Sequence, residues 1–125
     1  MIGITTHILD TATGRPALGV PVILFLLPEG DGPLREIARG TTDADGRLRD
    51  LLPPGKVVGK GVYKLRFGTK EYFARQAEGL RGAAEPGAVA SLYPFVEIIF
   101  EISTDEHYHI PLLLSPYGYS TYRGS

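Results

Sequence analysis

Cysteine is absent from the 125-residue sequence. Its absence excludes disulfide bonds, thiolate metal sites and thiol nucleophiles at once, and it leaves the redox compartment undetermined. An excess of positive charge is also missing, because 13 Lys and Arg residues stand against 14 Asp and Glu residues and are spread along the chain. Nucleic-acid binding usually needs a concentrated basic surface, so we expect no nucleic-acid partner.

Long apolar segments are missing too. No apolar run approaches the ~20 residues that span a bilayer, so we expect no membrane segment. The first residues, Met1 to His7, lack the basic and then apolar pattern of a signal peptide. We therefore expect a cytoplasmic location.

The length and composition are those of one compact domain. Apolar residues make up 43% of the chain and charged residues 22%, which is typical of a globular protein. Since 125 residues are too few for two ordinary domains, we expect residues 1–125 to form a single domain. The 16 glycines and 10 prolines imply many turns and favour short strands over long helices.

Short strands are predicted along most of the chain. They are indicated by alternating or continuous apolar and β-branched residues in segments 2–9, 20–27, 34–41, 61–67 and 92–102. The unbroken apolar run 20–27 suggests coverage of both its faces, by a second sheet or by another subunit. Helix formers with few breakers predict one short helix over 69–78, ended by Gly79, and 81–91 reads as a loop. The pattern predicts an all-β fold, an antiparallel β-sandwich of seven to eight strands with one short helix.

Two turn clusters interrupt these strands, at 10–16 and at 42–46. In the second, Asp43, Asp45 and Gly46 are turn residues, and Arg47 follows at the start of a short strand. An EF-hand calcium loop is the alternative, but the D-x-D-G fragment lacks the spaced ligands and the final glutamate of such a loop. We interpret the two aspartates as shaping the turn that presents Arg47.

The segment 107–125 holds many of the reactive side chains, and it reads HYHIPLLLSPYGYSTYRGS. We interpret it as a strand, a turn at 115–118 and a second strand. His107 and His109 alternate with apolar residues, so a strand here places both imidazoles on one face. Three tyrosines fit aromatic packing better than catalysis, namely Tyr108, Tyr117 and Tyr119.

Four stretches carry a resemblance to a known family: ITTHILD at 4–10, TDADGR at 42–47, HYHIPLL at 107–113 and YRGS at 122–125. They resemble those of the 5-hydroxyisourate hydrolases, the purine-catabolic branch of the transthyretin-like family. The resemblance extends over essentially the whole chain, with the loop 81–91 as an apparent insertion. YRGS is its most specific part, since transthyretin carriers share the neighbouring LLSPY pattern but do not end this way.

The resemblance implies a transthyretin-like fold, a homotetramer built as a dimer of dimers, and active sites in a channel between dimers. The implied reaction is hydrolysis of 5-hydroxyisourate to 2-oxo-4-hydroxy-4-carboxy-5-ureidoimidazoline, without a metal or organic cofactor. The implied catalytic residues are His7, Arg47, His109 and Ser125. The implied substrate-binding residues are His7, Arg47, Tyr122 and Arg123, and the role of His107 is left open.

The chemistry of these residue types agrees with that reaction. Opening a ring amide with water needs a base for the water proton and an acid for the leaving nitrogen, and histidine, with an ordinary pKa near ~6.5, serves either role. An arginine fork suits the planar oxygen edge of the substrate, and its charge stabilises the developing oxyanion. Which histidine is the base is not given by the sequence.

Two other readings of the same residues stay open. Three histidines could hold a zinc ion with a bound water, and H-x-H spacing allows this on one strand face, so metal analysis would separate the cases. A non-enzymatic carrier of a small hydrophobic ligand, as transthyretin is, is the second. The polar side chains of His7, Arg47, His109 and Arg123 argue against it.

Overall fold

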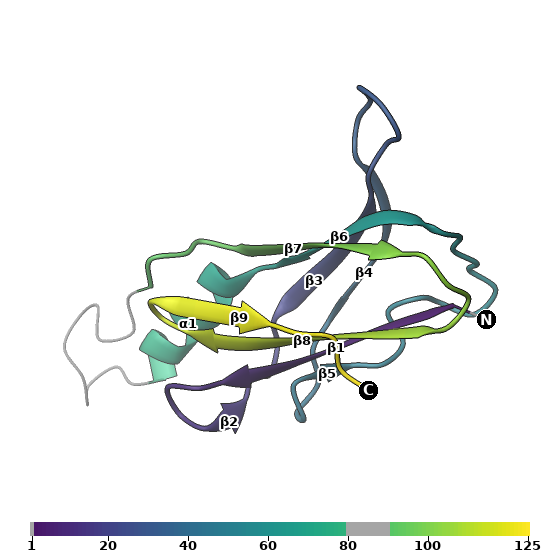
Figure 1. Ribbon diagram of the computed structural model, residues 1–125. Coiled ribbons are helices and arrows are strands. Elements are labelled where there is room, and N and C mark those ends of the chain that lie inside the picture. The colour runs from purple at the N-terminus through teal and green to yellow at the C-terminus, as the bar shows by residue number, and fades with distance from the viewer. Residues whose placement is uncertain (1, 80–90) are drawn as a thin grey trace.

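The structure is a computed structural model that describes residues 2–79 and 91–125, so the predicted loop 81–91 lies outside the described residues except for Ser91. Two β-sheets pack face to face, and one helix lies at one end of the sandwich (Figure 1). The predicted β-sandwich with one short helix is therefore confirmed. In chain order the elements are β1 (Gly3–Asp10), β2 (Arg15–Pro16), β3 (Pro21–Leu26), β4 (Arg35–Thr41), β5 (Arg47–Leu48), β6 (Gly61–Phe67), α1 (Thr69–Gly79), β7 (Val96–Ile102), β8 (His107–Ser115) and β9 (Gly118–Thr121).

The strands differ from the prediction in two ways: one additional short strand is present, and β7 begins later. The turn cluster 10–16 contains β2, a two-residue strand too short to show an alternating pattern, so the described chain has nine strands. β7 begins at Val96 and not at residue 92, because the preceding residues bind the start of α1. The carbonyl of Pro94 accepts a hydrogen bond from the Lys70 N–H at 3.0 Å, and the carbonyl of Tyr93 accepts one from the Thr69 hydroxyl at 3.1 Å.

The first sheet has the strand order β2-β1-β8-β9, with β5 also paired to β1, and the second has the order β4-β3-β6-β7. All pairings are antiparallel except that of β1 with β8, which is parallel. The wholly antiparallel expectation is wrong at this pair. Hairpin connections force neighbouring strands to be antiparallel, but almost the whole chain separates β1 from β8 and leaves their relative direction free.

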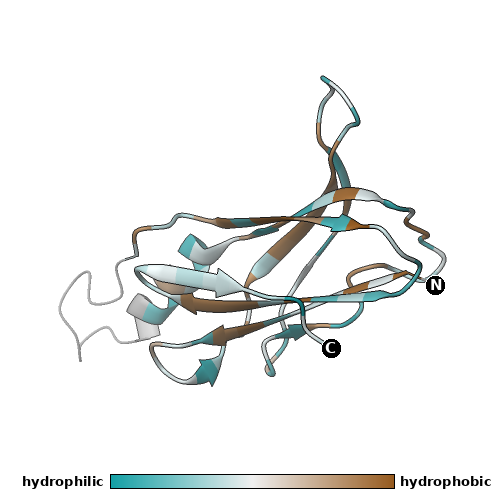
Figure 2. Ribbon diagram, viewed as in Figure 1, coloured by the Kyte–Doolittle hydropathy of each residue, from teal (hydrophilic) through white to brown (hydrophobic). Residues whose placement is uncertain are grey.

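The core is built by alternation along the strands. β1 buries Ile4, Thr6, Ile8 and Asp10, and β8 buries every second side chain from Tyr108 to Leu114. Figure 2 shows hydrophobic residues along β3, β7 and β8. The buried polar groups on β1 are satisfied, since the Thr6 hydroxyl donates to the Ile110 carbonyl at 2.6 Å and the Tyr72 hydroxyl donates to Asp10 at 2.6 Å.

The apolar run at β3 packs into this core on one face, where Val22 and Leu24 are buried. On its other face the ammonium of Lys64 lies 5.3 Å from the ring centre of Phe25. Coverage of that face by another subunit stays a prediction. The helix α1 has 11 residues, and no helix in the described part of the chain is long and apolar enough to cross a bilayer.

The turn before β5 has the form that its aspartates predict. One carboxylate oxygen of Asp43 accepts the backbone N–H groups of Asp45 at 2.9 Å and Arg47 at 3.0 Å, and the carbonyl of Asp43 accepts the N–H of Gly46 at 2.9 Å. Gly46 has a φ of 72°, a left-handed conformation that favours glycine. The interpretation of 42–46 as a turn that presents Arg47 is confirmed.

We expect Gly46→Ala to destabilise the fold much more than Gly14→Ala. Both glycines have a φ near 73°, which costs an alanine about 1–2 kcal/mol. Only at Gly46 does a Cβ also meet backbone, 2.5 Å from the Ile8 carbonyl oxygen, whereas nothing lies within 4 Å of a Cβ at Gly14. Urea unfolding of both variants measures the difference. Equal losses of unfolding free energy would show that the backbone contact has no energetic importance.

Candidate active site

The outer face of the first sheet carries the three histidines and Arg47. Alternation turns Thr5 and His7 of β1 outward, opposite to the buried Thr6. Arg47 of β5 is paired directly with His7, so both side chains lie on the same face. In β8 the buried residues are Tyr108 and Ile110, so His107 and His109 face outward together. The prediction that the two imidazoles share one face is confirmed.

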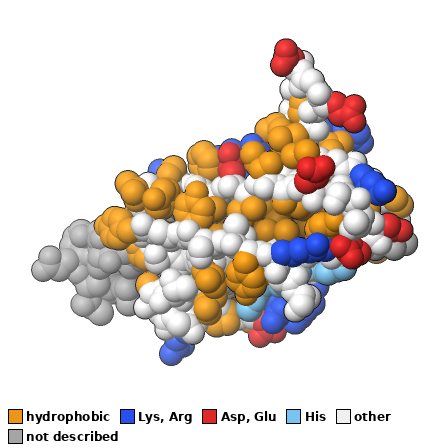
Figure 3. All heavy atoms as spheres, viewed as in Figure 1, with side chains coloured by type: hydrophobic (Ala, Val, Ile, Leu, Met, Phe, Trp, Pro, Cys, Tyr) orange, Lys and Arg blue, Asp and Glu red, His pale blue; other side chains and the backbone are white. Residues whose placement is uncertain are grey.

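A pocket of about 320 Å³ opens on this face. It is lined by Thr5, Thr6, Arg47, Arg49, His107, His109 and Ser125. His7 does not line this pocket, although it is the partner of Arg47 across the β1–β5 pair. Figure 3 shows histidine side chains beside basic and acidic ones near the sheet that contains β1 and β8. The structure thus brings three of the four predicted catalytic residues into one pocket, with the fourth beside it.

Thr5 joins the two histidines of β8. Its hydroxyl oxygen lies 2.8 Å from Nε2 of His107 and 2.8 Å from Nδ1 of His109. The parallel register places Thr5 directly beside His109, which explains the short contact. This contact uses Nδ1 of His109 and not Nε2.

Ser125 reaches the pocket because Gly124 lies against His109. The N–H of Gly124 donates to the His109 carbonyl at 2.9 Å, an isolated bridge beyond the end of β9. A Cβ on Gly124 would lie 2.4 Å from Cδ2 of His109 and 3.1 Å from Pro111. Only glycine allows the chain to approach the imidazole this closely, which gives a physical reason for the third residue of the YRGS segment.

The electrostatics of the site favour neutral imidazoles. Burial lowers the pKa of His109 below its ordinary value, and the positive charge of Arg47 lowers it further, followed by His7 and His107. Burial and then Arg47 also lower the pKa of His7, while a hydrogen bond with the Asp45 backbone acts in the opposite direction. Both side chains are therefore available as proton acceptors near neutral pH.

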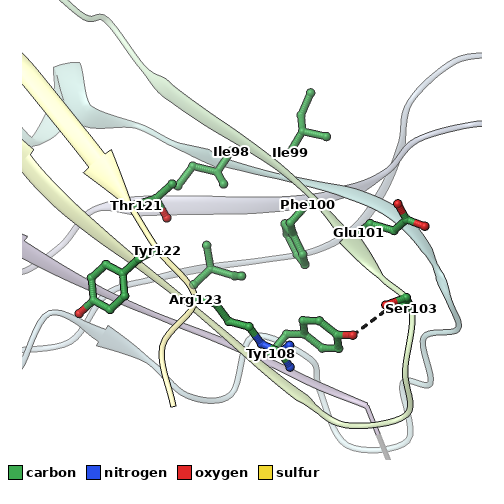
Figure 4. A pocket seen from close by; sticks show the side chains of 10 residues that line it. Ile98, Ile99, Phe100, Glu101, Ser103, Tyr108, Thr121, Tyr122 and Arg123 are labelled. Atoms are coloured by element: carbon green, nitrogen blue, oxygen red, sulfur yellow. Dashed lines mark hydrogen bonds between the residues drawn. The ribbon is translucent and has the colours of Figure 1, made fainter.

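Tyr122 and Arg123 lie elsewhere in the single chain. They border a second pocket, of about 280 Å³, between β7 and the β8–β9 hairpin (Figure 4). Arg123 donates to Glu106 at 2.8 Å, and its guanidinium lies 4.4 Å from the ring centre of Tyr108. The side chains of Tyr122 and Arg123 point apart in Figure 4. Within one chain, neither residue lines the pocket of His109.

Besides the buried Thr6, two pocket residues, Thr5 and Arg49, were missed in the sequence. Each stands two positions from a predicted site residue, Thr5 from His7 and Arg49 from Arg47, and a period of two places such pairs on one face of a strand. Arg49 also lies 3.6 Å from a carboxylate oxygen of Asp43, in an exposed ion pair at the turn. That spacing was the available signal for both residues.

The described part of the chain contains no group of three His, Cys, Asp or Glu side chains that could hold a metal ion. One ring nitrogen of each H-x-H histidine, Nε2 of His107 and Nδ1 of His109, contacts the Thr5 hydroxyl. Asp43 uses a carboxylate oxygen for backbone hydrogen bonds within its turn. Metal analysis of the purified protein remains the test of the zinc alternative.

Comparison with known proteins agrees on family and fold. The sequence profile described as HIUase/Transthyretin family matches residues 4–124. The chain is 43% identical over 126 residues to the 5-hydroxyisourate hydrolase of Halalkalibacterium halodurans, which covers 98% of this chain and 97% of that one. The solved 5-hydroxyisourate hydrolase of Klebsiella pneumoniae superposes with a TM-score of 0.75 at 35% identity, over 98% of this chain and 99% of that one. Sea bream transthyretin in complex with thyroxine superposes with a TM-score of 0.80 at 30% identity, over 98% and 94%.

We expect Arg47→Gln to raise the pKa of both His7 and His109, because Arg47 is the largest charge effect that lowers each. The pH titration of the histidine ring signals by NMR measures both values. Arg39→Gln is the matched control, since Arg39 lies in the second sheet and pairs with Glu36. Unchanged histidine titrations in Arg47→Gln would contradict the electrostatic account.

Proposed function

Because the chain belongs to the HIUase/Transthyretin family, we propose that it hydrolyses 5-hydroxyisourate to 2-oxo-4-hydroxy-4-carboxy-5-ureidoimidazoline. The observation that carries the proposal is the pocket in which Arg47, His109 and Ser125 meet, with His7 beside it. No cofactor is required, since the side chains present supply a base, an acid and a positive charge.

The fold alone does not separate a hydrolase from a carrier. The TM-scores are 0.75 to a hydrolase and 0.80 to a transthyretin, so the choice depends on the side chains. Two arginines and two histidines line the pocket, where a carrier of a hydrophobic ligand needs an apolar surface. This polar lining supports hydrolysis over the carrier alternative.

In the proposed mechanism His109 is the general base. It lines the pocket and has a lowered pKa, so its neutral Nε2 accepts a proton from the attacking water. The water oxygen bonds to the ring carbonyl carbon, the carbon–nitrogen bond of the ring amide then breaks, and the nitrogen takes up a proton. Arg47 binds the oxygen edge of the substrate and stabilises the oxyanion. His7, next to Arg47, assists the proton transfer to the leaving nitrogen of the ring amide. Ser125 donates a hydrogen bond to the substrate.

Tyr122 and Arg123 are proposed to bind substrate only in the assembled protein. We propose a homotetramer, a dimer of dimers, as the resemblance implies. Its support in the single chain is that β7 and β9 are both sheet edges, each unpaired on one side within the described residues. Ile99 of β7 is 61% exposed and Tyr122 after β9 is 57% exposed, which are high values for large apolar side chains. The cytoplasmic location expected from the sequence stays a prediction.

The decay of freshly generated 5-hydroxyisourate in the ultraviolet tests the activity. We expect the wild-type protein to accelerate it, and His109→Ala and Arg47→Ala each to lower kcat/KM by roughly 10²-fold or more. His7→Ala is expected to lower it as well. Arg39→Gln, in the second sheet, should retain full activity, and sedimentation should show the same assembly for all variants. Wild-type decay at the spontaneous rate would overturn the proposal and favour the carrier.

The pH dependence of kcat/KM tests the assignment of the base. Because the pKa of His109 is lowered from 6.5, the acid limb should lie below pH 6.5. In Arg47→Gln the limb should move toward higher pH as far as residual activity allows it to be measured. The lowered pKa values of His7 and His109 also weaken the fold in acid. The unfolded chain protonates these two histidines at a higher pH than the folded chain does, so the free energy of unfolding decreases as the pH falls from 6.5 through the folded pKa values. An acid limb above pH 6.5 would contradict His109 as the base.

A further inference from the structure

Thr5 occupies a position in the pocket to which the proposed mechanism gives no role. Its hydroxyl oxygen contacts Nε2 of His107 and Nδ1 of His109, each at 2.8 Å. A hydroxyl group has one hydrogen, so it donates to at most one of these nitrogens and accepts from the other. At least one of the two imidazoles therefore carries its proton on the nitrogen that faces Thr5.

We infer that Thr5 is a positioning residue, which accepts a hydrogen bond from Nδ1–H of His109 and thereby keeps Nε2 of His109 free of a proton. The inference rests on the proposed function, in which Nε2 of His109 takes the proton of water. The hydroxyl hydrogen of Thr5 is then directed to Nε2 of His107. This gives His107 a role as well, because it is the acceptor that orients the Thr5 hydroxyl.

The alternative arrangement does not suit a base. If Thr5 donated to Nδ1 of His109, the neutral ring would carry its proton on Nε2, where the water must be deprotonated. Accepting a second proton would then require the Thr5 hydroxyl to turn away during the reaction. In the inferred arrangement Nδ1–H donates to Thr5 both before and after Nε2 takes up the proton. No hydrogen bond has to reverse, which lowers the reorganisation that the step demands.

The packing around both rings supports a fixed geometry. His107 lies over Gly3, where a Cβ would be only 2.7 Å from Nδ1 of the ring. His109 is confined on its Cδ2 side by Gly124, where a Cβ would be only 2.4 Å away. The parallel register fixes Thr5 beside His109 and Gly3 beside His107. Thr5 therefore binds rings whose positions the backbone already restricts.

The charges around His109 explain why a hydroxyl suits this position. The charged groups that lower its pKa are Arg47 of β5, His7 of β1 and His107 of β8, all positive or able to become positive, while a hydrogen bond with the backbone of Thr5 raises it. A carboxylate at position 5 would also fix the tautomer, but its negative charge would raise the pKa of His109. A neutral hydroxyl orients the ring without that effect, and the base stays unprotonated near neutral pH.

The nitrogen-15 NMR signals of the histidine rings test the inference without substrate. In the wild-type protein at neutral pH we expect His109 to carry its proton on Nδ1. In Thr5→Val, which keeps the shape and removes the hydroxyl, the proton should move to Nε2, and in Thr5→Ser it should stay on Nδ1. Thr11→Val is the matched control, because it removes a hydroxyl that donates to the Leu114 carbonyl at 3.1 Å. This control should leave His109 unchanged.

Kinetics give the second measurement. Thr5→Val should lower kcat by roughly 10- to 100-fold with little change in KM, and Thr5→Ser should restore most of the loss. An Nε2–H tautomer of His109 in the wild-type protein, or an unchanged tautomer and kcat in Thr5→Val, would overturn the inference. Failure of the proposed function is a different result, since the wild-type protein would then not accelerate 5-hydroxyisourate decay at all.

Discussion

The parallel pairing of β1 with β8 is the constraint on which the rest of the site depends. It joins segments more than 100 positions apart, and its register sets Thr5 beside His109 and Gly3 beside His107. A shift of the register by one residue would exchange inward and outward side chains along β8, burying the histidines and exposing Tyr108 and Ile110. The hydrophobic core therefore fixes the site as well as the fold, because the side chains that hold the register alternate with those that form the pocket.

Arg47 and Ser125 each follow a glycine that lets the backbone approach another strand closely. Gly46 closes the turn before β5 with its left-handed φ and aligns Arg47 with His7. Gly124 approaches the imidazole of His109 where no side chain would fit, and so directs Ser125 to the pocket. Strands supply the histidines and Arg47, and the segment after β9 supplies Ser125, so the geometry needs both the sheet register and two close backbone approaches.

Much of this arrangement could be predicted from the sequence, because it depends on local patterns. Alternation predicted the shared face of His107 and His109, and turn residues predicted the presentation of Arg47. The direction of β1 relative to β8 could not be predicted, since a long connection does not constrain it. The position of Tyr122 and Arg123 at a second pocket could not be predicted either, since a motif gives the order of residues and not the pocket that each side chain reaches.

The position of Arg47 places two demands on one guanidinium. In the proposed mechanism its charge attracts an anionic substrate and stabilises an oxyanion, yet the same charge lowers the pKa of His109 and weakens it as a base. A bound anion would partly offset the positive charge of Arg47, so in the proposed mechanism the basicity of His109 increases when the substrate occupies the pocket. In the empty pocket the weaker base stays neutral and ready to accept a proton. The hydroxyl of Thr5 is compatible with this coupling because it orients the imidazole and adds no fixed charge of its own.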